Sequence, residues 1–170
     1  MKRVLWILGL VALTLAGCTK AATNSHNNNK VGIVQTEYGA LQGGISDGIY
    51  TYFGVPYAEA NERFVPAEKV QPWSGIRSAT DYGPISLQSS AGGFPVPDGI
   101  QANNAQNLNI WTTGLDGNKR AVMVWLHGGG FSNGSAQEVP AYNGENLSHK
   151  GDVVNHRVTS VSPGFAENAV

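Results

Sequence analysis

The fold is decided by the stretch Ala121-Val122-Met123-Val124-Trp125-Leu126-His127-Gly128-Gly129-Gly130, in which an unbroken apolar run passes directly into three glycines. A short continuous apolar run is typical of a strand that is buried on both faces, as in the middle of a parallel sheet. Glycine has no Cβ, so the loop that follows can adopt unusual φ and ψ values and let a ligand approach the backbone closely. Backbone N–H groups in such a loop can stabilise an oxyanion. The stretch therefore predicts an α/β fold whose buried strand ends at a backbone anion site.

Short antiparallel strands are predicted upstream of this stretch. Tyr38-Gly39 separates the segments 31–34 and 40–42. Asp47-Gly48 is a strong turn signal before the aromatic run 49–53. Both patterns predict hairpins near the start of the globular part.

The middle of the chain is predicted to be mostly irregular. Segment 66–88 contains several prolines and is expected to cross the surface with one short helix, and segment 91–101 is rich in glycine and proline and is expected to be a loop. Leu108–Thr112 alternates between apolar and polar residues, as a half-buried strand does.

The region after the glycine loop predicts one helix and one strand. Residues 145–150 can form a short helix, with Gly151 placed to stop it. Val153-Val154 begins a further strand, which we expect to end at Asn155-His156-Arg157. Hairpins followed by strand, loop, helix and strand indicate the start of an α/β domain.

The first residues are predicted to be an export signal that occupies 1–17. Lys2 and Arg3 precede an apolar run that is short for a membrane span, and the run ends in Leu15-Ala16-Gly17-Cys18. This ending resembles the lipobox of bacterial lipoproteins, which implies that Cys18 is lipidated and anchors the protein to a membrane of the cell envelope. Thr19, rather than aspartate, favours the outer membrane. The alternative is an ordinary secretory signal with an unrelated cysteine.

Two further segments complete the predicted organisation. Residues 18–30 are polar and asparagine-rich and are expected to be a flexible tether, so that the domain occupies 31–170. Loss of Lys2 and Arg3 takes the formal net charge from −1 to −3. No basic run indicates nucleic acid, and no histidine pair has metal-ligand spacing. We therefore expect no nucleic-acid partner, no metal and no cofactor.

The resemblance to one enzyme family is carried by blocks that occur in a fixed order. The chain resembles the N-terminal portion of the type B carboxylesterases, which include para-nitrobenzyl esterases and cholinesterases, in the blocks 52–58, 63–64, 72–75, 107–111, 127–130, 144–147 and 150–154. The resemblance implies the N-terminal part of an α/β-hydrolase fold, with small antiparallel hairpins leading into an incomplete mixed sheet. It also implies a serine esterase that acts on small carboxylic esters through an acyl-enzyme.

The same resemblance assigns roles to the glycine loop. Gly129 and Gly130 would provide the oxyanion hole, and His127 would orient the loop. The nucleophile, acid and base of the family would all lie beyond Val170, so we expect this chain alone to be inactive. One alternative is a non-catalytic, membrane-anchored binding lipoprotein that keeps the loop. Another is a nonproductive product of a frameshift or a split gene.

Two literal G-x-S-x-G patterns offer other nucleophiles. Ser46 lies in a predicted hairpin, where no strand-to-helix elbow forms. Ser132, with Glu145 and His149, would give the chain order serine, acid, histidine. However, Ser132 follows the glycine loop rather than a strand end, so we interpret it as part of a substrate-side loop.

The chain also departs from the family pattern. Several residues are expected to be deleted after Val154, and Thr159–Val170 no longer follows the family. Ser86 and Ala105 replace a cysteine pair that many relatives use for a disulfide.

Overall fold

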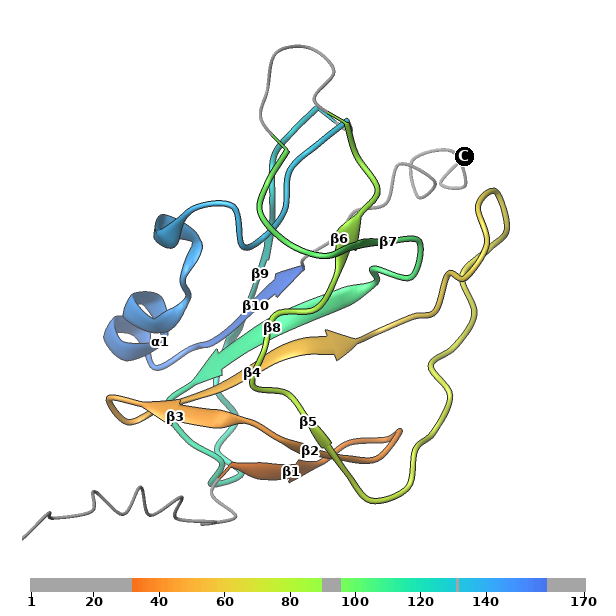
Figure 1. The fold of residues 1–170 in the computed structure, drawn as a ribbon. Coiled ribbons are helices and arrows are strands. Elements are labelled where there is room, and N and C mark those ends of the chain that lie inside the picture. Colours follow the sequence, from red (N-terminus) through yellow and green to blue (C-terminus); the bar gives the residue numbers. More distant parts are fainter. Residues whose placement is uncertain (1–31, 90–95, 131, 159–170) are drawn as a thin grey trace, which may run out of the picture.

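The computed structural model describes residues 32–89, 96–130 and 132–158 (Figure 1). The predicted signal, Cys18, the tether and the tail from Thr159 therefore lie outside the described residues. A five-stranded sheet has the order β3 (Gly44–Ser46), β4 (Ile49–Pro56), β8 (Asn107–Thr112), β10 (Val154–Val158) and β9 (Val122–Leu126). A three-stranded sheet has the order β1 (Ile33–Gln35), β2 (Ala40–Gln42) and β5 (Ile76–Ser78). A two-stranded sheet pairs β6 (Ile85–Ser86) with β7 (Gln101–Ala102).

Both predicted hairpins are confirmed. β1 pairs antiparallel with β2, and β3 pairs antiparallel with β4 across the Asp47-Gly48 turn. In the first turn, the Thr36 hydroxyl accepts hydrogen bonds from the Tyr38 and Gly39 N–H groups, each at 3.2 Å. Local turn chemistry therefore suffices to set these two elements.

The prediction of a short helix within 66–88 is wrong. This segment forms β5, which pairs parallel with β2, and β6, which pairs parallel with β7. The backbone N–H and C=O groups of β5 and β6 pair with strands that are distant in the sequence. The residue propensities of the segment alone do not reveal such pairing. The predicted loop 91–101 ends in β7, and residues 90–95 lie outside the described part.

The strands β4 and β8 form the antiparallel centre of the large sheet. Their register shifts between Tyr52 and Val55, at a bulge that contains Gly54. Gly54 has a φ of +62°, and an added Cβ would lie 2.9 Å from the Gly83 nitrogen. The fully buried Asn109 accepts a hydrogen bond from the Gly54 N–H at 3.0 Å. A buried amide side chain thus replaces the ladder bond that the bulge removes.

The strand β10 lies between β8 and β9. It runs antiparallel to β8, as Figure 1 shows, and parallel to β9. The expectation that this strand ends at Asn155-His156-Arg157 is wrong, because it continues to Val158. Backbone pairing on both sides holds the polar segment in the sheet, and this pairing does not depend on side-chain hydropathy.

The helix α1 (Glu145–Gly151) forms the crossover between the parallel strands β9 and β10, after a short 3₁₀ turn at Pro140–Tyr142. The predicted helix is confirmed, but its stop is not Gly151. The C-cap is Asp152, with φ 45° and ψ 44°, in the left-handed region. Asp tolerates this region better than most residues because its short polar side chain bonds locally.

The Asp152 carboxylate belongs to a polar cluster at the start of β9. It accepts hydrogen bonds from the Thr113 hydroxyl and from Arg120 Nε, the latter at 2.7 Å. The Arg120 guanidinium also pairs with both oxygens of Asp116, at 2.6 and 3.0 Å. The hydrogen bond from Arg120 is the main cause that lowers the pKa of Asp116, and the Thr113 hydroxyl is the main cause that lowers the pKa of Asp152. The cluster ties the residues before β9 to the end of α1.

The strand β9 is formed as predicted, but its side chains are not covered. The exposed fractions are 57% for Val122, 42% for Met123, 60% for Val124 and 59% for Leu126. Trp125 is half-buried and packs on Tyr142, with ring centroids 4.3 Å apart. Consecutive exposed residues point to opposite faces, so both faces of β9 are open. Among the described residues, the burial on both faces that the apolar run predicted is therefore not observed.

The predicted departure from the family after Val154 coincides with an unusual core residue. Asn155 is fully buried beneath the start of α1, and among the described residues its Oδ1 and Nδ2 atoms have no hydrogen-bond partner. An added Cβ at Gly144 would lie 3.1 Å from Asn155 Cγ, which shows how closely the helix approaches. A buried amide without partners destabilises a protein by about 1–3 kcal/mol.

We predict that Asn155→Val raises the free energy of unfolding by about 1–3 kcal/mol, because valine suits a strand and carries no unsatisfied polar atom. Urea unfolding measures this change. Asn109→Val is the matched control at an equally buried asparagine, and it should lower stability because Asn109 bonds the Gly54 N–H. Equal effects of the two substitutions would contradict the account.

Candidate functional site

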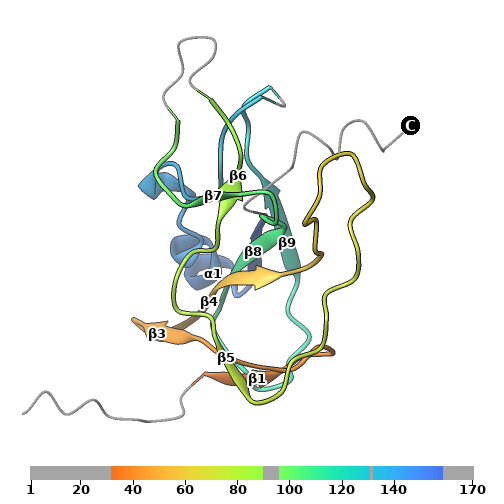
Figure 2. The same ribbon diagram turned by 45° about the vertical axis from the view of Figure 1, so that its right-hand side comes forward.

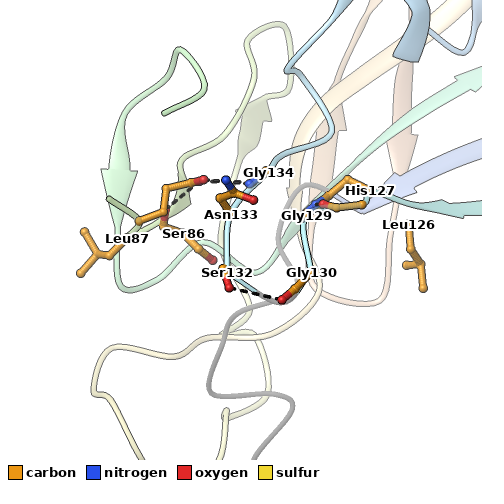
Figure 3. Close-up of a pocket in the computed structure, with 11 residues that line it drawn as sticks. Ser86, Leu87, Leu126, His127, Gly129, Gly130, Ser132, Asn133 and Gly134 are labelled. Carbon is orange, nitrogen blue, oxygen red and sulfur yellow. Dashed lines mark hydrogen bonds between the residues drawn. The ribbon is translucent and has the colours of Figure 1, made fainter. Parts of the chain in front are cut away.

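The glycine loop begins where β9 ends, at His127, and folds back on itself as a tight turn (Figure 3). The Gly129 carbonyl accepts hydrogen bonds from the Ser132 N–H at 3.1 Å and from the Asn133 N–H at 3.2 Å. The φ angles are +128° at Gly129, +60° at Gly130 and +108° at Gly134. Side chains disfavour such angles, so the backbone path itself requires glycine at these three positions.

Close contacts with neighbouring atoms also require glycine at positions 129 and 134. An added Cβ at Gly129 would lie 1.7 Å from the Asn133 carbonyl oxygen, and one at Gly134 would lie 2.4 Å from the Gly128 oxygen. By contrast, no described residue other than a chain neighbour lies within 4 Å of an added Cβ at Gly128 or Gly130. Gly129 and Gly134 therefore close the loop, whereas Gly128 and Gly130 leave open space beside the backbone.

This open space belongs to a pocket of about 240 Å³ (Figure 3). Its walls are residues 86–88 on one side and residues 126–130 and 132–134 on the other. Gly129 and Gly130 are exposed, and within the described residues neither of their N–H groups donates a hydrogen bond. The geometry therefore offers backbone donors to a ligand, as an anion or a polarised carbonyl requires.

His127 is positioned by the loop that it opens. Its Nδ1 lies 2.6 Å from the Gly128 carbonyl oxygen, and a proton on Nδ1 makes this a donated hydrogen bond. Its Nε2 is buried and has no hydrogen-bond partner within the part of the chain that the structure describes. The contact with Gly128 fits the loop-orienting role that the resemblance implies for His127.

Within the described residues, neither serine pattern forms a catalytic elbow. Ser46 ends β3 inside a hairpin, as predicted. Ser132 lies in the loop turn, is exposed, and its hydroxyl donates to the Gly130 carbonyl at 3.3 Å.

The partners suggested for Ser132 lie on a different element. Glu145 and His149 belong to α1, which packs on the central sheet, where the Ser148 hydroxyl donates to the Trp111 carbonyl at 3.1 Å. Neither Glu145 nor His149 is among the described residues that line the pocket. Figures 1 and 2 show α1 beside the sheet, whereas the glycine loop lies beyond the end of β9.

Sequence reasoning missed the second wall of the pocket. Gln88 lines the pocket and bonds to the glycine loop, although segment 66–88 was predicted to cross the surface as mostly irregular chain with one short helix. Nothing local in the sequence signals a contact between residues that are 46 positions apart.

Two properties of the described residues concern metals and membranes. Among them, no three histidine, cysteine or acidic side chains gather where a metal ion could be held. The same residues include no helix long and apolar enough to cross a membrane.

Comparison with known proteins places the fold and the loop in a family. The Carboxylesterase family matches residues 30–159. Phenmedipham hydrolase from Pseudarthrobacter oxydans is 38% identical over 130 residues, which are 72% of this chain and 26% of that protein. Para-nitrobenzyl esterase from Bacillus subtilis is 32% identical over 129 residues, again 72% and 26%.

Solved structures agree with these relatives. An esterase from Clostridium hathewayi superposes with a TM-score of 0.70 at 40% identity and covers 77% of this chain and 27% of that one. A carboxylesterase from Geobacillus stearothermophilus gives a TM-score of 0.66 at 36% identity, with 75% and 26% covered. The chain belongs to the carboxylesterase family and has part of its α/β-hydrolase fold. It spans about a quarter of the length of the curated relatives that it matches.

We predict that Gly129→Ala disrupts the loop, whereas Gly128→Ala leaves it intact, since only the first adds a Cβ against the Asn133 carbonyl. The measurement is the pattern of backbone amide chemical shifts over residues 127–134. In Gly129→Ala the shifts of Ser132 and Asn133 should change most, because their N–H groups bond the Gly129 carbonyl. If the two variants gave the same small changes, the close contact at Gly129 would be refuted.

Proposed function

We propose that this chain supplies the oxyanion-binding part of a carboxylic ester hydrolase, with the Gly129 and Gly130 N–H groups as donors. The observation that supports this most directly is that both N–H groups lie at a pocket and donate to no other described residue. Membership of the carboxylesterase family gives these donors their reaction class.

The chemistry follows from where charge develops in ester hydrolysis. Attack by a serine hydroxyl on the ester carbonyl forms a tetrahedral intermediate, and its oxygen becomes negative. Fixed donors at that oxygen are effective because they need no reorganisation during the reaction; removal of one donor from such a site lowers kcat about 10²- to 10³-fold. The positive φ angles at Gly129 and Gly130 preset the backbone for this task.

The covalent step needs a group that the described residues do not present. Within them, neither Ser46 nor Ser132 stands on a turn between a strand and a helix. We therefore infer that the chain by itself binds the polarised oxygen of an ester or acid but does not turn esters over.

The proposed substrates are small carboxylic esters. The pocket volume of about 240 Å³ suits a short acyl or alcohol group next to the loop. The relative named as a para-nitrobenzyl esterase supports this class of substrate without selecting among its members.

A titration of the ¹⁵N-labelled chain with butanoate, the product of short-chain ester hydrolysis, tests the binding proposal. We expect saturable shifts of the Gly129 and Gly130 amide resonances, because a carboxylate oxygen occupies the place of the developing oxyanion. Propanol at equal concentration is the uncharged control and should leave these resonances unmoved.

Hydrolysis of para-nitrophenyl butanoate, measured on the same sample, should stay at the buffer rate, and an organophosphonate should form no covalent adduct. Butanoate shifts that avoid Gly129 and Gly130 would contradict the binding role. A stoichiometric phosphonate adduct would contradict the absence of a nucleophile.

We also propose that the chain is exported and lipidated on Cys18, with residues 18–30 as a tether to the domain. The support is the sequence: a basic start, an apolar run, and the chain's single cysteine at the end of Leu15-Ala16-Gly17-Cys18. Two or more acyl chains would make such an anchor stable.

We predict that the chain, expressed in a bacterial host, incorporates an alkyne-labelled fatty acid and sediments with membranes. Cys18→Ala should abolish the label, whereas Thr19→Ala, the neighbouring control, should retain it. In-gel fluorescence after labelling measures the result. An unlabelled, soluble wild-type protein cleaved at another residue would identify an ordinary secretory signal instead.

A further inference from the structure

The side-chain amide of Gln88 forms hydrogen bonds with both the N–H and the carbonyl of Gly134. The Gly134 N–H donates to Gln88 Oε1 at 2.8 Å, and Gln88 Nε2 donates to the Gly134 carbonyl at 3.2 Å. A neighbouring strand would satisfy a residue in the same way. The carboxamide of Gln88 thus acts as a one-residue strand partner for the far end of the glycine loop (Figure 3 shows Gly134 at that end).

The orientation of this carboxamide is fixed by its other contacts. Gln88 Nε2 also donates to the Ser86 carbonyl at 3.3 Å, so both of its hydrogens are used. The Gln88 N–H donates to Gln101 Oε1 at 2.8 Å, which ties the residue to β7. A flipped amide would set its NH₂ group against the Gly134 N–H, so one orientation satisfies all these groups.

Gly134 is the residue through which this contact reaches the oxyanion donors. It is buried, and an added Cβ would lie 2.4 Å from the Gly128 oxygen and 2.8 Å from His127 Nδ1. A displacement of Gly134 toward these atoms would therefore push against Gly128 and His127 at the start of the loop. The Gly129 carbonyl is in turn held by the N–H groups of Ser132 and Asn133, which lead directly to Gly134. The position of the Gly129 and Gly130 donors depends on where Gly134 is held.

We propose that Gln88 is a positioning residue for the oxyanion loop: it acts through Gly134 to aim the Gly129 and Gly130 N–H groups into the pocket. This inference rests on the proposed function of the loop. Gln88 itself lines the pocket but is not assigned a contact with the reacting atoms. Its contribution is to hold the backbone donors in place before a ligand arrives, which is what makes them effective.

Three variants separate this role from simple packing. Gln88→Met keeps the length of the side chain but removes both hydrogen bonds to Gly134. Gln88→Glu keeps an acceptor for the Gly134 N–H and loses the donor to its carbonyl. Gln137→Ala is the matched control, because the Gln137 side chain donates to the Gly83 carbonyl at 3.4 Å, away from Gly134.

The readouts are amide hydrogen exchange at Gly134 and the butanoate dissociation constant from shifts at Gly129 and Gly130. In Gln88→Met we expect exchange at Gly134 to accelerate about tenfold and the dissociation constant to rise about threefold or more, since two hydrogen bonds are lost. Gln88→Glu should restore slow exchange at Gly134, and Gln137→Ala should change neither quantity. Thermal unfolding of each variant identifies any general loss of structure.

The possible results lead to different conclusions. If Gln88→Met changed exchange at Gly134 but left butanoate binding at the wild-type value, the positioning role would be overturned while the oxyanion loop survived. If Gln137→Ala weakened binding as much as Gln88→Met, the effect would be general loosening, which also overturns the role. If the wild-type chain bound no butanoate at Gly129 and Gly130, the proposed function itself would fail, and the role of Gln88 in it with it.

Discussion

The parallel pairing of β9 with β10 is the constraint on which the rest of the structure depends. It begins at the Val154 N–H, which donates to the Ala121 carbonyl at 2.9 Å, and continues to the end of both strands. Arg120 and its two carboxylate partners fix the chain just before β9. Because β10 also pairs with β8, the carboxyl end of β9 is held at one edge of the large sheet. The glycine loop starts there, so the position of β9 determines where the Gly129 and Gly130 N–H groups lie.

At three places where this fold leaves its ladders, an amide side chain replaces backbone pairing. Asn109 bonds the N–H of Gly54 at the bulge in β4. Asn107 donates to the Pro84 carbonyl at 2.8 Å and so holds the segment that leads to β6. Gln88 does the same for Gly134. Asn155 breaks this pattern, because its amide is buried and has no hydrogen-bond partner among the described residues.

Local signals in the sequence were enough to predict the hairpins, the helix after the glycine loop, and the strands β8 and β9. Asp47-Gly48 and Tyr38-Gly39 set turns by their own chemistry, and the apolar run 121–126 identified a strand. The sequence also singled out Gly129, whose tight contact with Asn133 explains why glycine stands there. What could not be predicted depends on distant partners. The pairing of β5 with β2, the extension of β10 to Val158 and the wall formed by Gln88 each join segments that only the folded chain brings together.

The most direct test of the central pairing is hydrogen exchange of the β9 amides, measured residue by residue. In the outer strand of a parallel pair, alternate N–H groups point toward the partner strand and the others toward the open edge. The account predicts alternating slow and fast exchange along Val122–Leu126, with the slow amides bonded to β10. Uniformly fast exchange would show that β9 is not paired with β10. Uniformly slow exchange would show that its outer edge is occupied, and either pattern would contradict the structure described.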